Sequence, residues 1–148
     1  MLLLHAAVTW CLVGLIWTIQ LVHYPLFDRV PEPGFRAFHE AHARRITWIV
    51  APLMAIELVT GVLLAVSSGA PALPPASVGL GLALLVVVWA STALLQVPLH
   101  ARLGERFTPA VHRALVGTNW LRTVAWTARG GIAAWMLAAA GGAGAIGP

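Results

Sequence analysis

Histidine is the residue type in this sequence that offers the clearest chemistry. Five of the six histidines flank long apolar segments, and only His5 lies near the start of the chain. Neutral imidazole is the commonest metal ligand among side chains, and rings drawn from separate helices can converge inside a bundle. The sequence therefore predicts a metal or haem site with the ligands His23, His39, His42, His100 and His112.

The identity of the bound group stays open at this level. A nitrogen-rich ligand set suits copper, iron or zinc. Haem b needs only two axial imidazoles, and arginines such as Arg122 are available for its propionates. Thiolate ligation is excluded because the single cysteine, Cys11, lies in an apolar stretch. His39 and His42 are spaced i,i+3, so they share a helix face without forming the H-E-x-x-H zinc motif.

Three side-chain amides accompany the histidines. Two of them precede a histidine by about one helical turn, and the third lies in the last apolar segment, so each is suited to orient a ring nitrogen by a hydrogen bond. These residues are Gln20, Gln96 and Asn119. Arg122 follows one turn later and either closes the histidine layer or extends its charge to the membrane interface.

Two ionisable residues lie deep inside apolar segments, where a charge is costly and marks function or a pairing partner. Glu57 and Arg129 each follow an expected inner-face histidine of their own helix by roughly 25 Å. At this matching depth they can pair across the bundle. The alternatives are an ion pair that fixes helix register and a role in proton or substrate handling. We take Glu57, Arg122 and Arg129 as candidate catalytic residues.

The composition decides which kind of fold must position these groups. Of 148 residues, 59% are hydrophobic and 9% are charged. This balance excludes a water-soluble globule and a disordered chain. The nine basic residues are all arginine and are dispersed, so a nucleic-acid partner is not expected. The lipid bilayer is the expected partner.

Four segments are long and apolar enough to cross a bilayer as helices. They predict an all-α, integral membrane four-helix bundle forming a single transmembrane domain, with spans at about 2–22, 46–66, 78–97 and 115–140. Arginines gather between the first and second spans and between the third and fourth, while the middle connection (67–77) is uncharged. The positive-inside rule then predicts a multi-pass protein of a bacterial-type inner (plasma) membrane, with arginine-bearing loops in the cytoplasm and both termini outside.

The two halves of the chain share a faint pattern. The segments 17–25 and 89–100 each contain a Trp, then a Gln, then a His beside a Pro. This pattern indicates two repeated helix pairs, although chance similarity stays open. The glycine- and alanine-rich tail, 133–147, offers close helix contact and predicts that a homo-oligomer can form.

Short motifs resemble known small membrane families. The segment 45–54 with the following Gly61, the residues from His5 to Gly14, and the run 24–27 resemble membrane-bound protoporphyrinogen oxidases. That resemblance implies haem b, oxidation of a porphyrinogen, and a haem-ligand role for His5. The run 119–122 with Trp126 is similar to anthrone-oxygenase-like membrane families.

The combined expectation is a metal- or haem-binding membrane protein. It acts as an oxidoreductase or oxygenase on a hydrophobic small molecule, at a histidine-rich site near the cytoplasmic face. The alternative is a transporter or binding protein for a metal or small solute, with Glu57 and Arg129 along its path. The third hypothesis is that the protein is a structural subunit of a membrane complex.

Overall fold

The computed structural model describes residues 1–67 and 74–144, and every element in these ranges is helical, as predicted. Most of the uncharged middle connection and the end of the predicted small-residue tail lie outside the described residues. The elements form four rods: α1 (Leu2–Thr18) continued by η1 (Ile19–His23) and η2 (Pro25–Arg29), α2 (Glu32–Val66), α3 (Pro75–Ser91) continued by η3 (Thr92–Gln96) and α4 (Val97–Glu105), and α5 (Pro109–Gly144).

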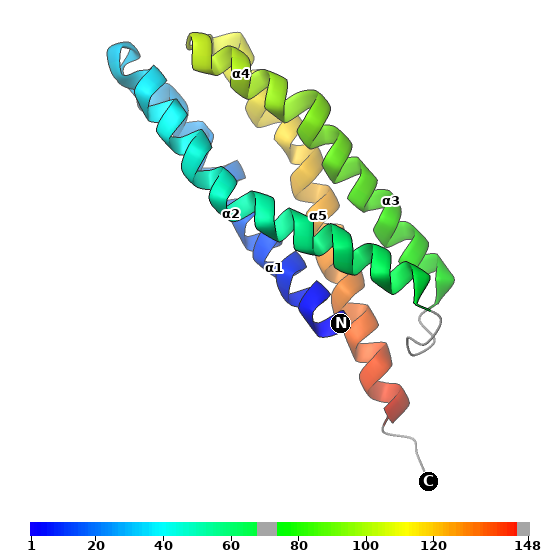
Figure 1. The fold of residues 1–148 in the computed structure, drawn as a ribbon. Coiled ribbons are helices and arrows are strands. Elements are labelled where there is room, and N and C mark those ends of the chain that lie inside the picture. The colour runs from blue at the N-terminus through cyan, green and yellow to red at the C-terminus, as the bar shows by residue number, and fades with distance from the viewer. Residues whose placement is uncertain (68–73, 145–148) are drawn as a thin grey trace.

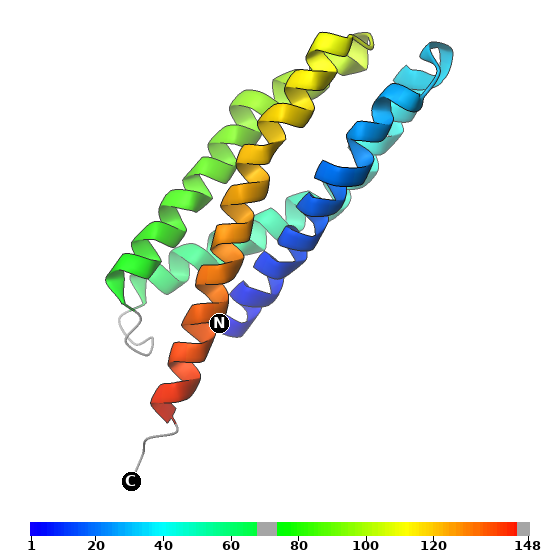
Figure 2. The same ribbon diagram turned by 180° about the vertical axis from the view of Figure 1, so that it is seen from behind.

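The rods run alternately up and down as a four-helix bundle (Figure 1). The N-terminus lies at the same end as the connection from α2 to α3, and the η2–α2 and α4–α5 turns lie at the opposite end. We call the end with these two turns the inner end and the other the outer end. Seen from behind, α5 runs between α1 and α3 (Figure 2), and these are the two helices it packs against most.

Three helical rods are long and apolar enough to cross a membrane, namely Leu2–Arg29, Glu32–Val66 and Pro75–Glu105. The fourth rod, α5, is long but more polar, since Arg122 and Arg129 lie within its predicted span. Both arginines are buried, with 5% and 4% of their surface exposed. The neighbouring helices therefore cover the polar face of α5.

Prolines explain where several helices begin. α5 begins at Pro109, directly after Thr108, as the sequence predicts. α2 begins at Glu32, well before the predicted span that starts at about residue 46. Pro33 is tolerated there, since the backbone N–H groups of a first turn have no partner within the helix. Residues 35–45 therefore form a helical extension of the predicted second span.

Two short π-helical segments occupy corresponding places in the first and third rods. η1 and η3 are each followed, after one residue, by a proline, Pro25 or Pro98. The proline ring crowds the preceding turn, so a widened turn relieves the clash. Each π segment holds a buried glutamine, Gln20 or Gln96. This correspondence supports the repeat that the sequence indicated.

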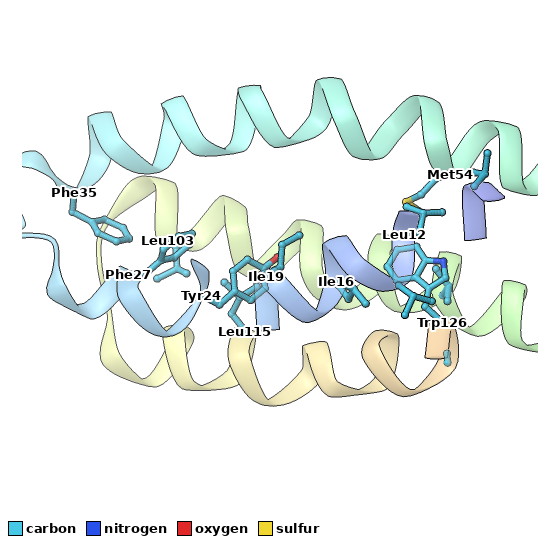
Figure 3. Close-up of a cluster of buried hydrophobic side chains, with 14 residues drawn as sticks. Leu12, Ile16, Ile19, Tyr24, Phe27, Phe35, Met54, Leu103, Leu115 and Trp126 are labelled. Atoms are coloured by element: carbon cyan, nitrogen blue, oxygen red, sulfur yellow. The ribbon is translucent and has the colours of Figure 1, made fainter. Parts of the chain in front are cut away.

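The apolar core is a row of buried side chains along the bundle (Figure 3). Ile16, Ile19 and Leu115 lie in its middle, and aromatic rings lie at both ends. Towards the inner end the row closes on Phe27 and Phe35, both nearly inaccessible to solvent. The candidate histidines are arranged around this aromatic end.

Candidate functional site

The phenyl ring of Phe27 lies at the centre of the predicted histidine layer. Its centroid is 5.1 Å from the ring of His42, 5.8 Å from His39, and 6.4 Å from both His100 and His112. Four of the five imidazoles are thus brought together from α2, α4 and α5. An apolar ring, itself fully buried, occupies the middle of the group.

A hydrogen-bonded chain links three residues of this layer. His39 Nε2 lies 2.9 Å from His100 Nδ1, and His100 Nε2 lies 2.8 Å from the Tyr24 hydroxyl. A neutral imidazole donates from one nitrogen and accepts at the other, so the chain can be polarised in either direction. We call this chain of hydrogen bonds the relay.

His112 is not part of the relay and binds a backbone carbonyl instead. Its Nε2 donates to the backbone carbonyl oxygen of Tyr24 over 2.7 Å. The same carbonyl oxygen also accepts a hydrogen bond from the backbone N–H of Phe27 over 3.2 Å. His112 therefore ties α5 to the end of the first rod.

A pocket opens beside the relay, between the end of η1 and the first half of α2. The rings of His23 and His42 lie 5.5 Å apart there. The cavity measures about 310 Å³, and its lining residues are His23, Phe38, Ala41, His42, Arg45, Ile46 and Ile49. His42 Nε2 is buried without a hydrogen-bond partner among the described residues. We call this cavity the lateral pocket.

Burial also sets the charge of the histidines that precede the apolar part of α2. Desolvation lowers the pKa of His39 below its ordinary value. Desolvation lowers the pKa of His42 as well, and the neighbouring His23 and His39 lower it further. Both imidazoles are therefore neutral at pH 7, so each ring carries one N–H and one lone pair.

A metal ion held by three or more protein ligands does not fit this arrangement. Within residues 1–67 and 74–144, no group of three His, Cys, Asp or Glu side chains is placed to bind one ion. Two ring nitrogens that could bind a metal, His39 Nε2 and His100 Nδ1, instead form a hydrogen bond with each other. No porphyrin plane can lie between nitrogens at that distance.

The three amides hold the bundle together at mid-depth. The Gln20 side-chain oxygen accepts a hydrogen bond from Asn119 Nδ2 over 2.8 Å, and its Nε2 donates to the Val116 carbonyl. Gln96 Nε2 donates to the Thr118 hydroxyl over 3.0 Å. Both glutamines thus bind the same part of α5 rather than the histidine rings.

The predicted pairing of Glu57 with Arg129 is confirmed. Arg129 Nε donates to Glu57 Oε1 over 3.0 Å, and both side chains are buried. The same carboxylate accepts hydrogen bonds from the Thr9 hydroxyl and from Trp126 Nε1, each over 3.0 Å. Three donors from α1 and α5 therefore satisfy the charge of Glu57.

Sequence reasoning missed Thr9 and Trp126 as partners of Glu57. Trp126 precedes Arg129 by one turn, so the i,i+3 rule could have placed both on one face of α5. Thr9 gave no comparable signal, because a threonine in an apolar helix commonly bonds its own backbone.

Arg122 lies between the two polar clusters. Its guanidinium lies over the Trp126 ring, 5.0 Å from the centroid, and its Nη1 donates to Asn119 Oδ1 over 3.3 Å. This contact is a cation–π interaction in a desolvated setting. Arg122 therefore links the amides near the relay to the Trp126 that binds Glu57.

Comparison with protein-family models, with curated proteins and with solved structures found no match for this chain. The function must be argued from the geometry.

Proposed function

We propose that the protein is an integral membrane oxidoreductase for a hydrophobic substrate that carries an ionisable hydroxyl group, of the quinol or phenol class. The observation that carries the proposal is the position of the relay beside the lateral pocket. Oxidation of a phenolic hydroxyl releases a proton with each electron, so this chemistry needs proton acceptors at the substrate. Neutral imidazoles are the usual groups for that task at pH 7.

The lateral pocket suits such a substrate. Phe38, Ile46 and Ile49 offer apolar walls, while a few polar groups fix orientation, as is typical of small-molecule sites. His42 Nε2 is the free acceptor for a substrate hydroxyl. Arg45 supplies a positive charge beside the oxygen that loses its proton. Since Ile46 begins the predicted apolar span, a molecule dissolved in the bilayer can enter sideways.

The protons have a route away from the pocket. The His42 ring lies nearly parallel to the His100 ring, with centroids 6.3 Å apart. In the relay, a hydrogen can shift from Tyr24 to His100 while another shifts from His100 to His39, so a proton enters at one end and leaves at the other. General acid–base catalysis of this kind contributes about 10²–10⁴ in rate.

The electrons need an acceptor of their own. Conversion of a quinol to a quinone releases two electrons and two protons. Because the described imidazoles do not form a metal site of three or more ligands, the proposal assigns the electrons to a separate electron acceptor that meets the substrate at the pocket. The predicted role as a subunit of a larger membrane complex is compatible with this assignment.

The orientation of the protein belongs to the same proposal. Both arginine-bearing connections lie at the inner end of the bundle (Figure 1). Their position at one end supports a cytoplasmic inner end, with both termini on the outside. The relay and the lateral pocket then lie near the cytoplasmic face.

The test uses the whole protein in lipid nanodiscs, with a short-chain ubiquinol as substrate and ferricyanide as electron acceptor. Metal content and an optical spectrum are recorded first. We expect saturable quinol binding and oxidation, weaker binding in His42→Gln, and about 100-fold slower oxidation with unchanged binding in Tyr24→Phe. Cys11→Ser, at an exposed position outside the site, is the control. Absence of quinol binding in the wild type contradicts the proposal.

A proton-coupled transporter for a metal or small solute is the second candidate. The observation that favours it is the ion pair of Glu57 and Arg129 within the predicted spans, where buried charges commonly mark a transport path. Its test is metal or proton flux into liposomes that carry the protein. Flux that disappears in Glu57→Gln, without quinol oxidation in nanodiscs, favours transport over the oxidoreductase.

A further inference from the structure

We infer that the outer end of the bundle holds a binding site for one water molecule or a similarly small hydroxylic molecule, between Arg129 and His5. The site is distinct from the lateral pocket and does not depend on the proposed oxidoreductase function. A cavity of about 20 Å³ lies there, and its lining residues are His5, Gly61, Leu64, Val78, Gly81, Leu82, Arg129, Ile132, Ala133 and Met136. A water molecule needs roughly 10–15 Å³ of such volume.

Arg129 supplies the donor. Its Nε binds Glu57, and its Nη1 donates to the Gly81 carbonyl. Nη2 is buried and has no partner in the described part of the chain, although the residue is only 4% exposed. An unpaired donor at this depth is costly unless a ligand or water accepts its hydrogen.

His5 supplies the acceptor. Its Nδ1 lies 2.8 Å from the Thr60 hydroxyl oxygen, and that hydroxyl also lies within hydrogen-bond distance of the Ile56 carbonyl (2.7 Å) and the Glu57 carbonyl (3.2 Å). With the hydroxyl hydrogen donated to a carbonyl, the Thr60 oxygen accepts from His5, so we assign the ring proton to Nδ1. Nε2 of the neutral ring is left with a lone pair.

The two groups face the same space. A methyl group built on Gly61 would lie 3.3 Å from His5 Cε1 and 4.0 Å from Arg129 Nη2. The absence of a side chain at Gly61 therefore leaves room where the donor and the acceptor approach one another. Leu64, Leu82 and Ile132 wall the remaining space with apolar atoms.

The charges around the cavity between Arg129 and His5 determine which class of ligand can bind there. Glu57 already neutralises Arg129, and a lone pair on His5 repels an anion. A molecule that accepts one hydrogen bond and donates another satisfies both groups. Water fits this requirement and the volume, whereas chloride or a carboxylate does not.

Nuclear magnetic resonance of ¹⁵N-labelled protein in lipid nanodiscs tests the inference. We expect the His5 proton on Nδ1, and a magnetisation-transfer peak from water to the Arg129 Nη2 hydrogens. Trp126 Nε1–H, which binds Glu57, should show no such peak. Gly61→Ala should lose the peak, whereas Gly79→Ala, whose methyl group meets no atom within 4 Å, should keep it.

Three outcomes overturn the inference. The first is a wild-type His5 that is protonated on Nε2, and the second is the absence of the water peak at Arg129. The third is a shift of the Arg129 signals when chloride is exchanged for bromide, which would show an anion in the site. The first two measurements need only the wild-type protein, so they hold even where Gly61→Ala fails to fold.

Discussion

Glu57 of α2 and Arg129 of α5 form a buried ion pair, with 3.0 Å between Oε1 and Nε. Both charges are removed from bulk solvent, since their side chains are 0% and 3% exposed. Desolvation of two charges is costly, and their mutual attraction repays it only while both are present. The pair therefore fixes how α2 and α5 align.

Removal of one partner should destabilise the bundle by about 3–5 kcal/mol, because it leaves an uncompensated buried charge. We expect this loss for Glu57→Gln and for Arg129→Gln, measured as the free energy of unfolding in mixed micelles. The double variant should lose less than the sum of the two. Glu40→Gln, which removes an exposed ion pair with Arg36, should cost at most about 1 kcal/mol. Equal stability of Glu57→Gln and the wild type would contradict the prediction.

The two corresponding glutamines should differ in their contribution to stability. Gln20→Leu leaves the Asn119 amide buried without its acceptor, which should cost about 1–3 kcal/mol. Gln96→Leu breaks one hydrogen bond to Thr118 but also removes a side-chain oxygen that has no partner among the described residues. It should therefore cost less than Gln20→Leu. Thermal unfolding of both variants in one detergent decides the order.

The fold could be predicted because the features that specify it, the apolar segments and the prolines at their ends, can be recognised along the sequence alone. Apolar segments of spanning length and prolines at their ends read directly as helices and boundaries, as Pro109 shows. The pairing of Glu57 with Arg129 followed from equal depth, which helix rise alone supplies. Glu57 and Arg129 lie in an apolar bundle that offers each of them few other charged residues to pair with.

The geometry of the histidines was not predictable from spacing. Sequence placed five imidazoles at one depth, but it could not say that Phe27 lies among them. Helix rotation decides which side chain faces inward, and the π segments Ile19–His23 and Thr92–Gln96 change that rotation. The direct bond between His39 and His100 depends on such a detail.

Phe27 should be among the most costly residues to truncate at the inner end. Phe27→Ala removes a fully buried ring that contacts four imidazoles, so we expect a loss of about 3–5 kcal/mol in the free energy of unfolding. Phe38→Ala is the matched control, because Phe38 is 41% exposed and its ring is only partly enclosed. A smaller loss for Phe27→Ala than for Phe38→Ala would show that Phe27 does not hold the layer together.

The predicted orientation can be tested with single cysteines, because the natural cysteine is replaceable. In a Cys11→Ser background, Arg36→Cys lies at the exposed inner end and Ala76→Cys at the exposed outer end. A membrane-impermeant thiol reagent added to intact cells should label Ala76→Cys and leave Arg36→Cys unlabelled until the membrane is opened. The physical reason is that arginine-rich connections stay on the cytoplasmic side. The reverse pattern would place the relay and the lateral pocket on the outside, and their substrate would then reach them from the outer leaflet.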